Sequence, residues 1–327
     1  MCSIRGLGRY LPEKVLSNAD LEKIVDTTDA WITQRTGIKT RRVMAADQCT
    51  SDLAVEAAKD ALADAKLDVA DIDMLIVTTV TPDHLCPATA CVVHKKLGMT
   101  GTPAFDLNIA CSGFGYGVTV AAGLVRSGLY RNVLVVSAEA MTRFIDYSDR
   151  ASCILFGDGA GAAVFSREGR IDLLHTRNGA DGSFAEMIEI PGGGSREPTS
   201  TETLANRRHF LHVRGREVFK TAVRQMVDST HIALRELELT PDDIDWIVPH
   251  QANGRIIEAV AEALEVPIER VIVDLIEHGN TSSASIPIAL CGLDRTQGLR
   301  PGQIVVLVGF GAGAAWSCQV LRVRDRS

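Results

Sequence analysis

The chain lacks the features that mark membrane, nucleic-acid-binding and disulfide-stabilised proteins. No apolar stretch is long and uninterrupted enough to span a bilayer. There is no long run of Lys and Arg, and 34 basic against 41 acidic residues give a net charge of −7, so we expect neither a membrane nor a nucleic acid as partner. The eight cysteines include no Cys-x-x-Cys pair, and Met1 to Arg9 carries no signal-peptide pattern. We therefore expect free thiols and a cytoplasmic protein.

What the chain does contain is an internal repeat. A glycine-rich septet at Gly157 to Ala163 recurs at Gly309 to Ala315, with six of the seven positions identical. A second pair of similar segments is Asp71 to Ile76 and Asp243 to Val248. Two related halves in one chain predict a pseudo-twofold axis, with loops at equivalent ends of the halves converging on one site.

Each half alternates strand-like and helix-like patterns. The expected elements are a helix at 53–65 with Ser51 as its N-cap, strands at 74–80 and 132–137, a helix at 218–237, and strands at 246–248 and 304–308. Such alternation is typical of parallel strands covered by helices. We therefore predict a duplicated α/β layered fold with halves at 1–168 and 169–327, the first carrying an insertion at 140–156.

Cys111 stands at an expected strand-to-helix turn. It follows the apolar stretch 105–107 and opens the glycine-rich run 111–117, which leads into a helical pattern. A cysteine at the first turn of a helix faces unpaired N–H groups and the positive end of the helix dipole, and both favour the thiolate. The alternative is a small buried hydrophobic residue, and position alone does not separate the two.

The repeat adds two side chains to this turn. Aligning Asp106 with Asp274 puts the counterpart of Cys111 beside Asn280. His250 directly follows an expected strand, and open α/β folds bind ligands at the carboxyl ends of their strands. Taken singly, Asn280 could be a turn residue and His250 a loop histidine. Taken together, the repeat predicts that the thiol, the imidazole and the carboxamide meet at one site.

At these residues the chain resembles the β-ketoacyl-acyl-carrier-protein synthase III family of the thiolase-fold superfamily. The likeness runs from Gly6 to Val323. The matching stretches are 21–37, 106–115, 148–164, 248–257, 279–285 and 309–316. The resemblance implies a thiolase-like αβαβα fold and a homodimer in which the residue at Cys86 reaches the neighbouring subunit's pocket. It also implies a decarboxylating condensation of an acyl-CoA primer with malonyl-acyl carrier protein, which initiates fatty acid biosynthesis without a cofactor or metal.

The chemistry suits the three residues. A thiolate both attacks and leaves readily, so Cys111 is expected to hold the acyl group as a thioester. Loss of carbon dioxide from a malonyl thioester collects charge on an enolate oxygen, to which neutral His250 and Asn280 can each donate an N–H. Backbone N–H groups of Cys111 and of the loop from Gly311 to Gly313 are expected to polarise the acyl carbonyl.

The resemblance also implies binding residues. For coenzyme A and its pantetheine these are Trp31, Arg35, Arg150, Phe219 and Asn253, although Trp31 could be a helix-packing residue. For the carrier protein they are Lys220, Gln251, Ala252 and Arg255. The family often has a bulky aromatic before a proline at the end of the acyl pocket, and this chain has Cys86 there, so we expect a deeper pocket and primers longer than acetyl.

Other interpretations fit less well. Gly309, Gly311 and Ala314 match a dinucleotide-binding fingerprint, but too few residues follow for the helix, strand and acidic residue that it needs. A metal site built from His84, Cys86, Cys91 and His94 resembles no usual zinc spacing. A closer alternative is a related condensing enzyme or acyltransferase of specialised metabolism that uses a CoA-bound or small-molecule acceptor. A non-catalytic scaffold would not need the thiol, imidazole and carboxamide together.

Overall fold

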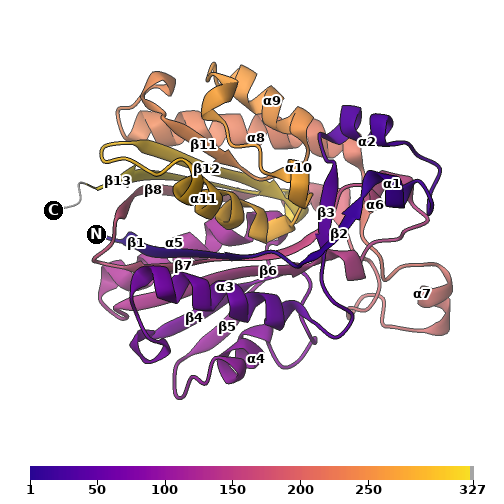
Figure 1. Cartoon of the computed structure of the whole chain (residues 1–327), viewed down its shortest axis with the longest axis horizontal. Helices are drawn as coiled ribbons and strands as arrows, with labels where there is room; N and C mark the ends of the chain where they lie inside the picture. Colours follow the sequence, from indigo (N-terminus) through magenta and orange to yellow (C-terminus); the bar gives the residue numbers. More distant parts are fainter. Residues whose placement is uncertain (325–327) are drawn as a thin grey trace.

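A computed structural model describes residues 1–324 and shows a layered α/β molecule (Figure 1). Nine strands form one hydrogen-bonded sheet in the order β11-β12-β13-β8-β1-β7-β6-β4-β5. Their bounds are β1 Ser3–Tyr10, β4 Met74–Thr78, β5 Ala104–Leu107, β6 Asn132–Ala140, β7 Asp158–Ser166, β8 Ile171–Ala180, β11 Trp246–Pro249, β12 Ile304–Gly311 and β13 Ala315–Val323. Two small ribbons pair β2 Lys14–Ser17 with β3 Thr40–Val43, and β9 Ile188–Glu189 with β10 His212–Val213.

Helices cover both faces of the folded sheet and fill the space between its halves. In Figure 1, α8 and α9 lie above the upper strands, α5 and α11 lie between the upper and the lower strands, and α3 is drawn across the lower strands with α4 beneath it. The long helices are α3 Thr50–Ala65, α4 Thr89–Lys96, α5 Gly113–Ser127, α8 Gly215–Glu236, α9 Gly254–Ala263 and α11 Ser285–Thr296. The others are α1 Asn18–Leu21, α2 Asp29–Thr36, α6 Arg150–Cys153, α7 Thr201–Ala205 and α10 Leu275–His278. This is the predicted αβαβα layering.

The strands are less uniformly parallel than the alternation of patterns indicated. β4 pairs in parallel with β5 and β6, and β11 pairs in parallel with β12, but the strands nearer the middle of the sheet pair antiparallel. β1 joins the two halves through the residue pairs Ser3–Asp172 and Ile4–Ile171. β4 is buried along its whole length, because helices cover both of its faces.

One helix start differs from the prediction. The N-cap of α3 is Cys49, whereas the sequence pattern indicated Ser51. The Cys49 backbone N–H donates to Asp52 Oδ2 at 2.9 Å, and the Ser51 N–H donates to Asp83 Oδ1 at 3.0 Å. Two carboxylates therefore satisfy the first N–H groups of this helix, and serine is not needed as the cap.

The two halves match each other around the turns before α5 and α11. The register differs from the one obtained by aligning Asp106 with Asp274. A 3₁₀ turn starts at Ala110 before α5, and another starts at Ser282 before α11. Both first residues have left-handed backbone, with φ of 47° and 49°. The counterpart of Cys111 is therefore Ser283, and the prediction that Asn280 holds this position is wrong.

The predicted insertion in the first half is confirmed. β6 ends at Ala140 and β7 begins at Asp158, with α6 between them, whereas β12 and β13 are separated only by the turn Ala312–Ala314. The two glycine septets consequently occupy different places. The first lies at the start of β7, and the second runs from the end of β12 into β13.

Candidate active site

Cys111, His250 and Asn280 line one cavity of about 950 Å³ at the ends of the strands. Most of the other lining side chains are apolar, among them Met141, Phe156 and Leu211. All three candidate residues are buried from bulk solvent, at 9%, 3% and 5% exposure respectively. The structure therefore brings together the thiol, the imidazole and the carboxamide that the sequence singled out.

Cys111 sits on the 3₁₀ turn immediately before α5, and glycine makes room for its backbone. A Cβ at Gly311 would lie 2.7 Å from the Cys111 backbone nitrogen and 2.9 Å from its Cβ. Ser112 Oγ donates to the Ala315 carbonyl at 2.9 Å, which ties this turn to the start of β13. The nucleophile is thus held between the end of one half and the glycine-rich turn of the other.

The pKa of the Cys111 thiol is raised, whereas its position at the start of a helix was expected to favour the thiolate. Burial raises the pKa of the thiol to about 12, while the neighbouring Ser282 hydroxyl acts to lower it and Glu139 acts to raise it further. The start of α5 favours a thiolate, but the loss of solvation on burial outweighs that effect. The neutral thiol is therefore the resting form at neutral pH.

His250 directly follows β11 and is fixed from two sides. Its backbone N–H donates to the Val308 carbonyl at 2.8 Å, and its Nδ1 lies 2.7 Å from Ser285 Oγ. Burial lowers the pKa of the imidazole to about 3. The ring is therefore neutral at physiological pH and carries one N–H.

Asn280 is oriented by its own backbone surroundings. Its N–H donates to the Leu155 carbonyl at 2.8 Å, and its carbonyl accepts from the Gly157 N–H at 3.1 Å. Its side-chain Oδ1 accepts from the Ser282 N–H at 2.8 Å. With Oδ1 occupied, the Nδ2 amide group is the part of the side chain left for a ligand in the cavity.

A buried carboxylate beside the site escaped the sequence analysis. Glu139 on β6 is fully buried, and its Oε2 accepts from Thr81 Oγ1 at 2.8 Å and from the Val80 N–H at 3.1 Å. Its Oε1 accepts from Ser283 Oγ at 2.7 Å. Burial raises its pKa. A lone acidic residue in an otherwise apolar strand was the available signal, and its bonds join the loop after β4 to the turn that follows Asn280.

The residues expected to hold coenzyme A fall into two groups. Two guanidinium groups lie over the Trp31 ring, with Arg35 Cζ 5.2 Å and Arg150 Cζ 4.7 Å from its centroid. These three do not line the cavity, although Trp31 packs on a cluster whose members include Phe156 and Leu211, which do. Phe219 and Asn253 line the cavity directly, and Asn253 Oδ1 also caps α9 by accepting from the Arg255 N–H.

Cys86 is exposed and does not line the cavity of its own chain. Residues 79–88, here called the Asp83 loop, instead bring Asp83, His84 and Leu85 to the cavity wall. The predicted effect of Cys86 on the acyl pocket therefore does not arise within one chain.

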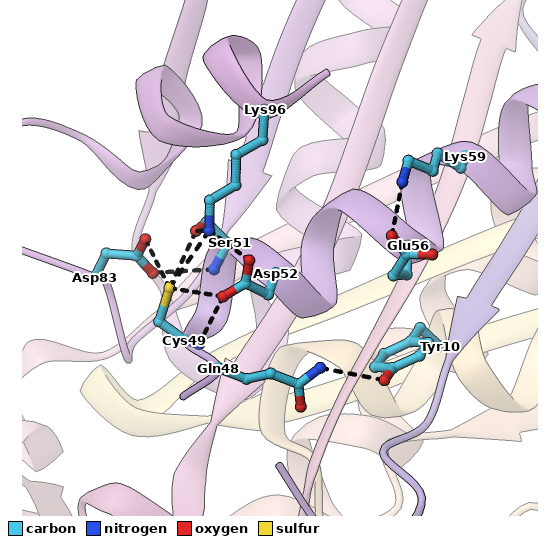
Figure 2. A network of polar contacts seen from close by, with 9 residues as sticks. All are labelled: Tyr10, Gln48, Cys49, Ser51, Asp52, Glu56, Lys59, Asp83 and Lys96. Carbon is cyan, nitrogen blue, oxygen red and sulfur yellow. Dashed lines mark hydrogen bonds and ion pairs between the residues drawn. The ribbon is translucent and has the colours of Figure 1, made fainter. Parts of the chain in front are cut away.

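The Asp83 loop is anchored to α3 and α4 by the polar network in Figure 2. Asp83 Oδ2 lies 3.3 Å from Cys49 Sγ, and its Oδ1 accepts the Ser51 N–H. Lys96 Nζ pairs with Asp52 Oδ1 at 2.6 Å and donates to Ser51 Oγ at 2.7 Å. One side of the cavity is thereby attached to the outer helices.

The residues expected to contact a carrier protein are not equally accessible. Lys220 and Arg255 are exposed, and Ala252 is partly buried on the cavity wall. Gln251 is only 1% exposed: its Oε1 accepts from the Asp274 and Leu275 N–H groups, and its Nε2 donates to the Pro249 and Ile272 carbonyls. The prediction that Gln251 contacts a carrier protein is therefore wrong, because every polar atom of its side chain is used internally.

Gly311 and Gly313, both expected to polarise the acyl carbonyl, occupy different places in the turn after β12. Gly313 lines the cavity in left-handed conformation, with φ of 78°, whereas Gly311 packs against Cys111 and does not line it. The neighbouring Ala314 is also left-handed, with φ of 44°. The geometry suits a turn that presents backbone groups to the cavity.

Three further features concern the described residues 1–324. None of their helices is long and apolar enough to cross a membrane. Within the same range, no group of three or more His, Cys, Asp or Glu side chains is arranged to hold a metal ion. All eight cysteines are free in the described residues, and only Cys86 and Cys91 are exposed.

Comparison with known proteins places the chain in a family. Residues 105–182 match the family model described as 3-oxoacyl-[acyl-carrier-protein (ACP)] synthase III, and residues 234–323 match the model of its C-terminal part. The chain is 49% identical over 320 residues to a β-ketoacyl-[acyl-carrier-protein] synthase III of Caldanaerobacter subterraneus subsp. tengcongensis, covering 98% of this chain and 97% of that protein.

Solved structures agree in fold. The 3-oxoacyl-[acyl-carrier-protein] synthase III of Aquifex aeolicus VF5 is similar with a TM-score of 0.91 and 41% identity, covering 98% of this chain and all of that one. The priming β-ketosynthase of the R1128 polyketide biosynthetic pathway is similar with a TM-score of 0.90 and 35% identity, covering 100% and 97% of the two chains. The predicted thiolase-like fold is confirmed, and the chain belongs to the β-ketoacyl-[acyl-carrier-protein] synthase III family of condensing enzymes.

Proposed function

We propose that this chain condenses an acyl-CoA primer with malonyl-acyl carrier protein and so begins the synthesis of a fatty acyl chain. The products are a 3-oxoacyl-acyl carrier protein, carbon dioxide and free coenzyme A. The observation that carries the proposal is the presence of Cys111, His250 and Asn280 on one largely apolar cavity, in a chain whose family performs condensations of this kind.

In the first half-reaction, the sulfur of Cys111 attacks the thioester carbon of the primer. The bond to the coenzyme A sulfur breaks, coenzyme A leaves as a thiol after taking up the proton that Cys111 lost, and the acyl group stays on Cys111. Because burial raises the pKa of Cys111 to about 12, deprotonation must accompany attack. The N-terminus of α5 favours the charge as it forms.

In the second half-reaction, the malonyl thioester loses carbon dioxide and the electron pair of the broken carbon–carbon bond forms an enolate. The enolate carbon attacks the acyl carbon, and the Cys111 sulfur leaves and takes up a proton. Neutral His250 and the Nδ2 group of Asn280 can each donate a hydrogen bond to the enolate oxygen. Preorganised donors of this kind contribute roughly 2.7–4 kcal/mol each to the transition state.

Coenzyme A would bind across the mouth of the cavity. Trp31 offers an aromatic face for the adenine, and Arg35 and Arg150 beside it offer guanidinium groups for the phosphates. Phe219 and Asn253 are set along the cavity wall, where the pantetheine arm would pass. We also propose that primers longer than acetyl are accepted, because Cys86 stands where the family often has a bulky aromatic residue. A panel in which acetyl-CoA far outperforms every longer or branched acyl-CoA would contradict that preference.

The carrier protein would dock beside the cavity mouth. Lys220 and Arg255 are exposed cations close to Phe219 and Asn253 in sequence, and they suit an acidic partner although the chain has a net charge of −7. We propose a cytoplasmic location in keeping with the free cysteines.

We also propose a homodimer. Leu85 on the Asp83 loop is 88% exposed, which is unusual for a large apolar side chain beside a functional cavity. In a homodimer this loop would reach the partner subunit, and Cys86 would then act on the partner's acyl pocket.

The likeness to a priming β-ketosynthase of a polyketide pathway supports a second candidate, in which the same chemistry starts a specialised metabolite. Product analysis tests the condensation with malonyl-acyl carrier protein that the primary proposal requires. The purified enzyme is given an acyl-CoA with malonyl-acyl carrier protein, or with malonyl-CoA, or with no malonyl donor. A 3-oxoacyl-acyl carrier protein formed only in the first reaction supports the primary proposal, and condensation only with malonyl-CoA contradicts it.

A further inference from the structure

A serine hydroxyl lies under the catalytic imidazole. Ser285 is the first residue of α11 and is 3% exposed. Its Oγ is 2.7 Å from His250 Nδ1, and it accepts the Gln251 N–H at 3.3 Å. The serine therefore contacts Nδ1 of the ring, and Nε2 is the ring nitrogen left for a ligand.

Counting hydrogens decides which atom donates. A hydroxyl has one hydrogen and can accept two hydrogen bonds. Ser285 Oγ already accepts from Gln251, and among the described residues the only acceptor that it contacts is His250 Nδ1. If Nδ1 carried the ring proton, the buried hydroxyl hydrogen of Ser285 would have no acceptor, and a buried polar hydrogen without a partner is costly.

The other half of the molecule shows that the fold itself does not require this hydroxyl. The counterpart of Ser285 at the start of α5 is Gly113, and Thr78 at the end of β4 takes the place that corresponds to His250. A Cβ at Gly113 would lie 3.1 Å from the Cβ of Thr78. The same corner of the fold therefore forms with no side chain at the position equivalent to Ser285, so the fold does not require a hydroxyl at that position.

We propose that Ser285 is a positioning residue that donates to His250 Nδ1 and holds the ring proton on Nε2, the nitrogen available to the cavity. This inference rests on the proposed function, because it explains how His250 can donate to the enolate oxygen. A neutral imidazole is a donor at one nitrogen only, so the tautomer decides whether the donor faces the substrate or the serine. Burial keeps the ring neutral, since it lowers the pKa of His250 to about 3.

The tautomer is measured directly by nuclear magnetic resonance. Protein labelled with ¹⁵N-histidine is recorded near neutral pH, and the His250 signals are identified by their absence in His250→Asn. The wild type should show Nδ1 as an unprotonated nitrogen and Nε2 as a protonated one. In Ser285→Ala the Nδ1 hydrogen bond is gone, and the signals should move toward a mixture of tautomers. Ser285→Thr keeps the hydroxyl and should keep the wild-type pattern.

Kinetics provide a second readout. Ser285→Ala should lower kcat for condensation by about 10- to 100-fold, the cost of one lost buried hydrogen bond at a reacting group. The rate of acyl transfer to Cys111 should change by less than about threefold, because the enolate forms only in the second half-reaction. Ser229→Ala is the matched control: Ser229 is 2% exposed, its Oγ donates to the Gln225 carbonyl on α8, and it does not line the cavity.

The outcomes separate this inference from the proposed function. If wild-type protein forms no 3-oxoacyl product at all, the proposed function fails whatever the tautomer is. If wild-type protein condenses normally but its His250 carries the proton on Nδ1, the role of Ser285 is wrong while the function stands. The role is also wrong if Ser285→Ala keeps the wild-type tautomer and kcat.

Discussion

Gly311 packs directly on Cys111, so closely that a Cβ at Gly311 would lie 2.7 Å from the Cys111 backbone nitrogen. Each residue belongs to a different half of the molecule, one to the end of β12 and the other to the turn before α5. The position of the nucleophile is therefore set by the contact between the halves.

This contact predicts that Gly311→Ala displaces the nucleophile. The added methyl cannot be accommodated without movement of the Cys111 backbone, and overpacking of this kind costs about 1–3 kcal/mol. We expect acylation of Cys111 to slow by at least roughly tenfold, measured by quenched-flow mass spectrometry. Gly123→Ala is the control, because nothing lies within 4 Å of a Cβ there and it is on a helix. Equal acylation rates in Gly311→Ala and wild type would show that the contact does not position the thiol.

The raised pKa of Cys111 predicts how alkylation depends on pH. Below a pKa of about 12 the thiolate fraction rises roughly tenfold for each pH unit. The rate constant for iodoacetamide modification of Cys111, followed by peptide mass spectrometry, should therefore increase steadily between about pH 6 and pH 9. A rate that levels off near neutral pH would mean that the thiolate is already formed in the free enzyme.

The lowered pKa of His250 predicts a loss of stability in acid. Unfolded histidine takes up a proton near pH 6.5, whereas the folded ring resists protonation until about pH 3. Between these values the unfolded state binds more protons, so the free energy of unfolding falls as the pH falls.

In denaturant titrations, the wild type should lose up to about 1.4 kcal/mol more for each pH unit than His250→Asn does below about pH 6.5. Parallel stability curves for the two proteins would show that His250 is not held neutral by burial.

The contacts of Trp31 with Arg35 and Arg150 predict a selective binding defect. Trp31→Ala should raise KM for acyl-CoA by roughly tenfold and leave kcat nearly unchanged, because the nucleotide binds equally in ground and transition states. A short thioester of N-acetylcysteamine has no nucleotide and serves as the matched control substrate. If Trp31→Ala impairs both substrates alike, Trp31 supports the fold of the N-terminal segment and does not bind the nucleotide.

The sequence predicted the layered fold because the buried strands and amphipathic helices repeat along the chain. It also predicted the insertion before β7, because the distance between strand and glycine septet differs in the two halves. The register between the halves was wrong, since two aligned aspartates were too short a match. The left-handed residues Ala110 and Ser282, which mark the true register, are invisible in residue type.

The site could be predicted only in part. Cys111 and His250 were found because a thiol and an imidazole stand at element ends, whereas Asn280 was reached through the alignment of the two halves, whose register was wrong. Gln251 was misjudged, because a glutamine in a loop-like segment gives no sign that its amide is used by four backbone groups. Glu139 and Ser285 act through neighbours that are distant in sequence, so their contacts are seen only in the structure, although an acidic residue in a mostly apolar strand was a signal for Glu139.

The central claim is that Cys111 carries the primer to the malonyl donor. Intact-protein mass spectrometry tests it most directly: wild-type enzyme is mixed with an acyl-CoA, the adduct is mapped, and malonyl-acyl carrier protein is then added. We predict a single acyl group on Cys111 that disappears as 3-oxoacyl-acyl carrier protein forms, and no adduct in Cys111→Ala. Condensation at the wild-type rate by Cys111→Ala, or an adduct on another residue that is passed to product, would contradict the account.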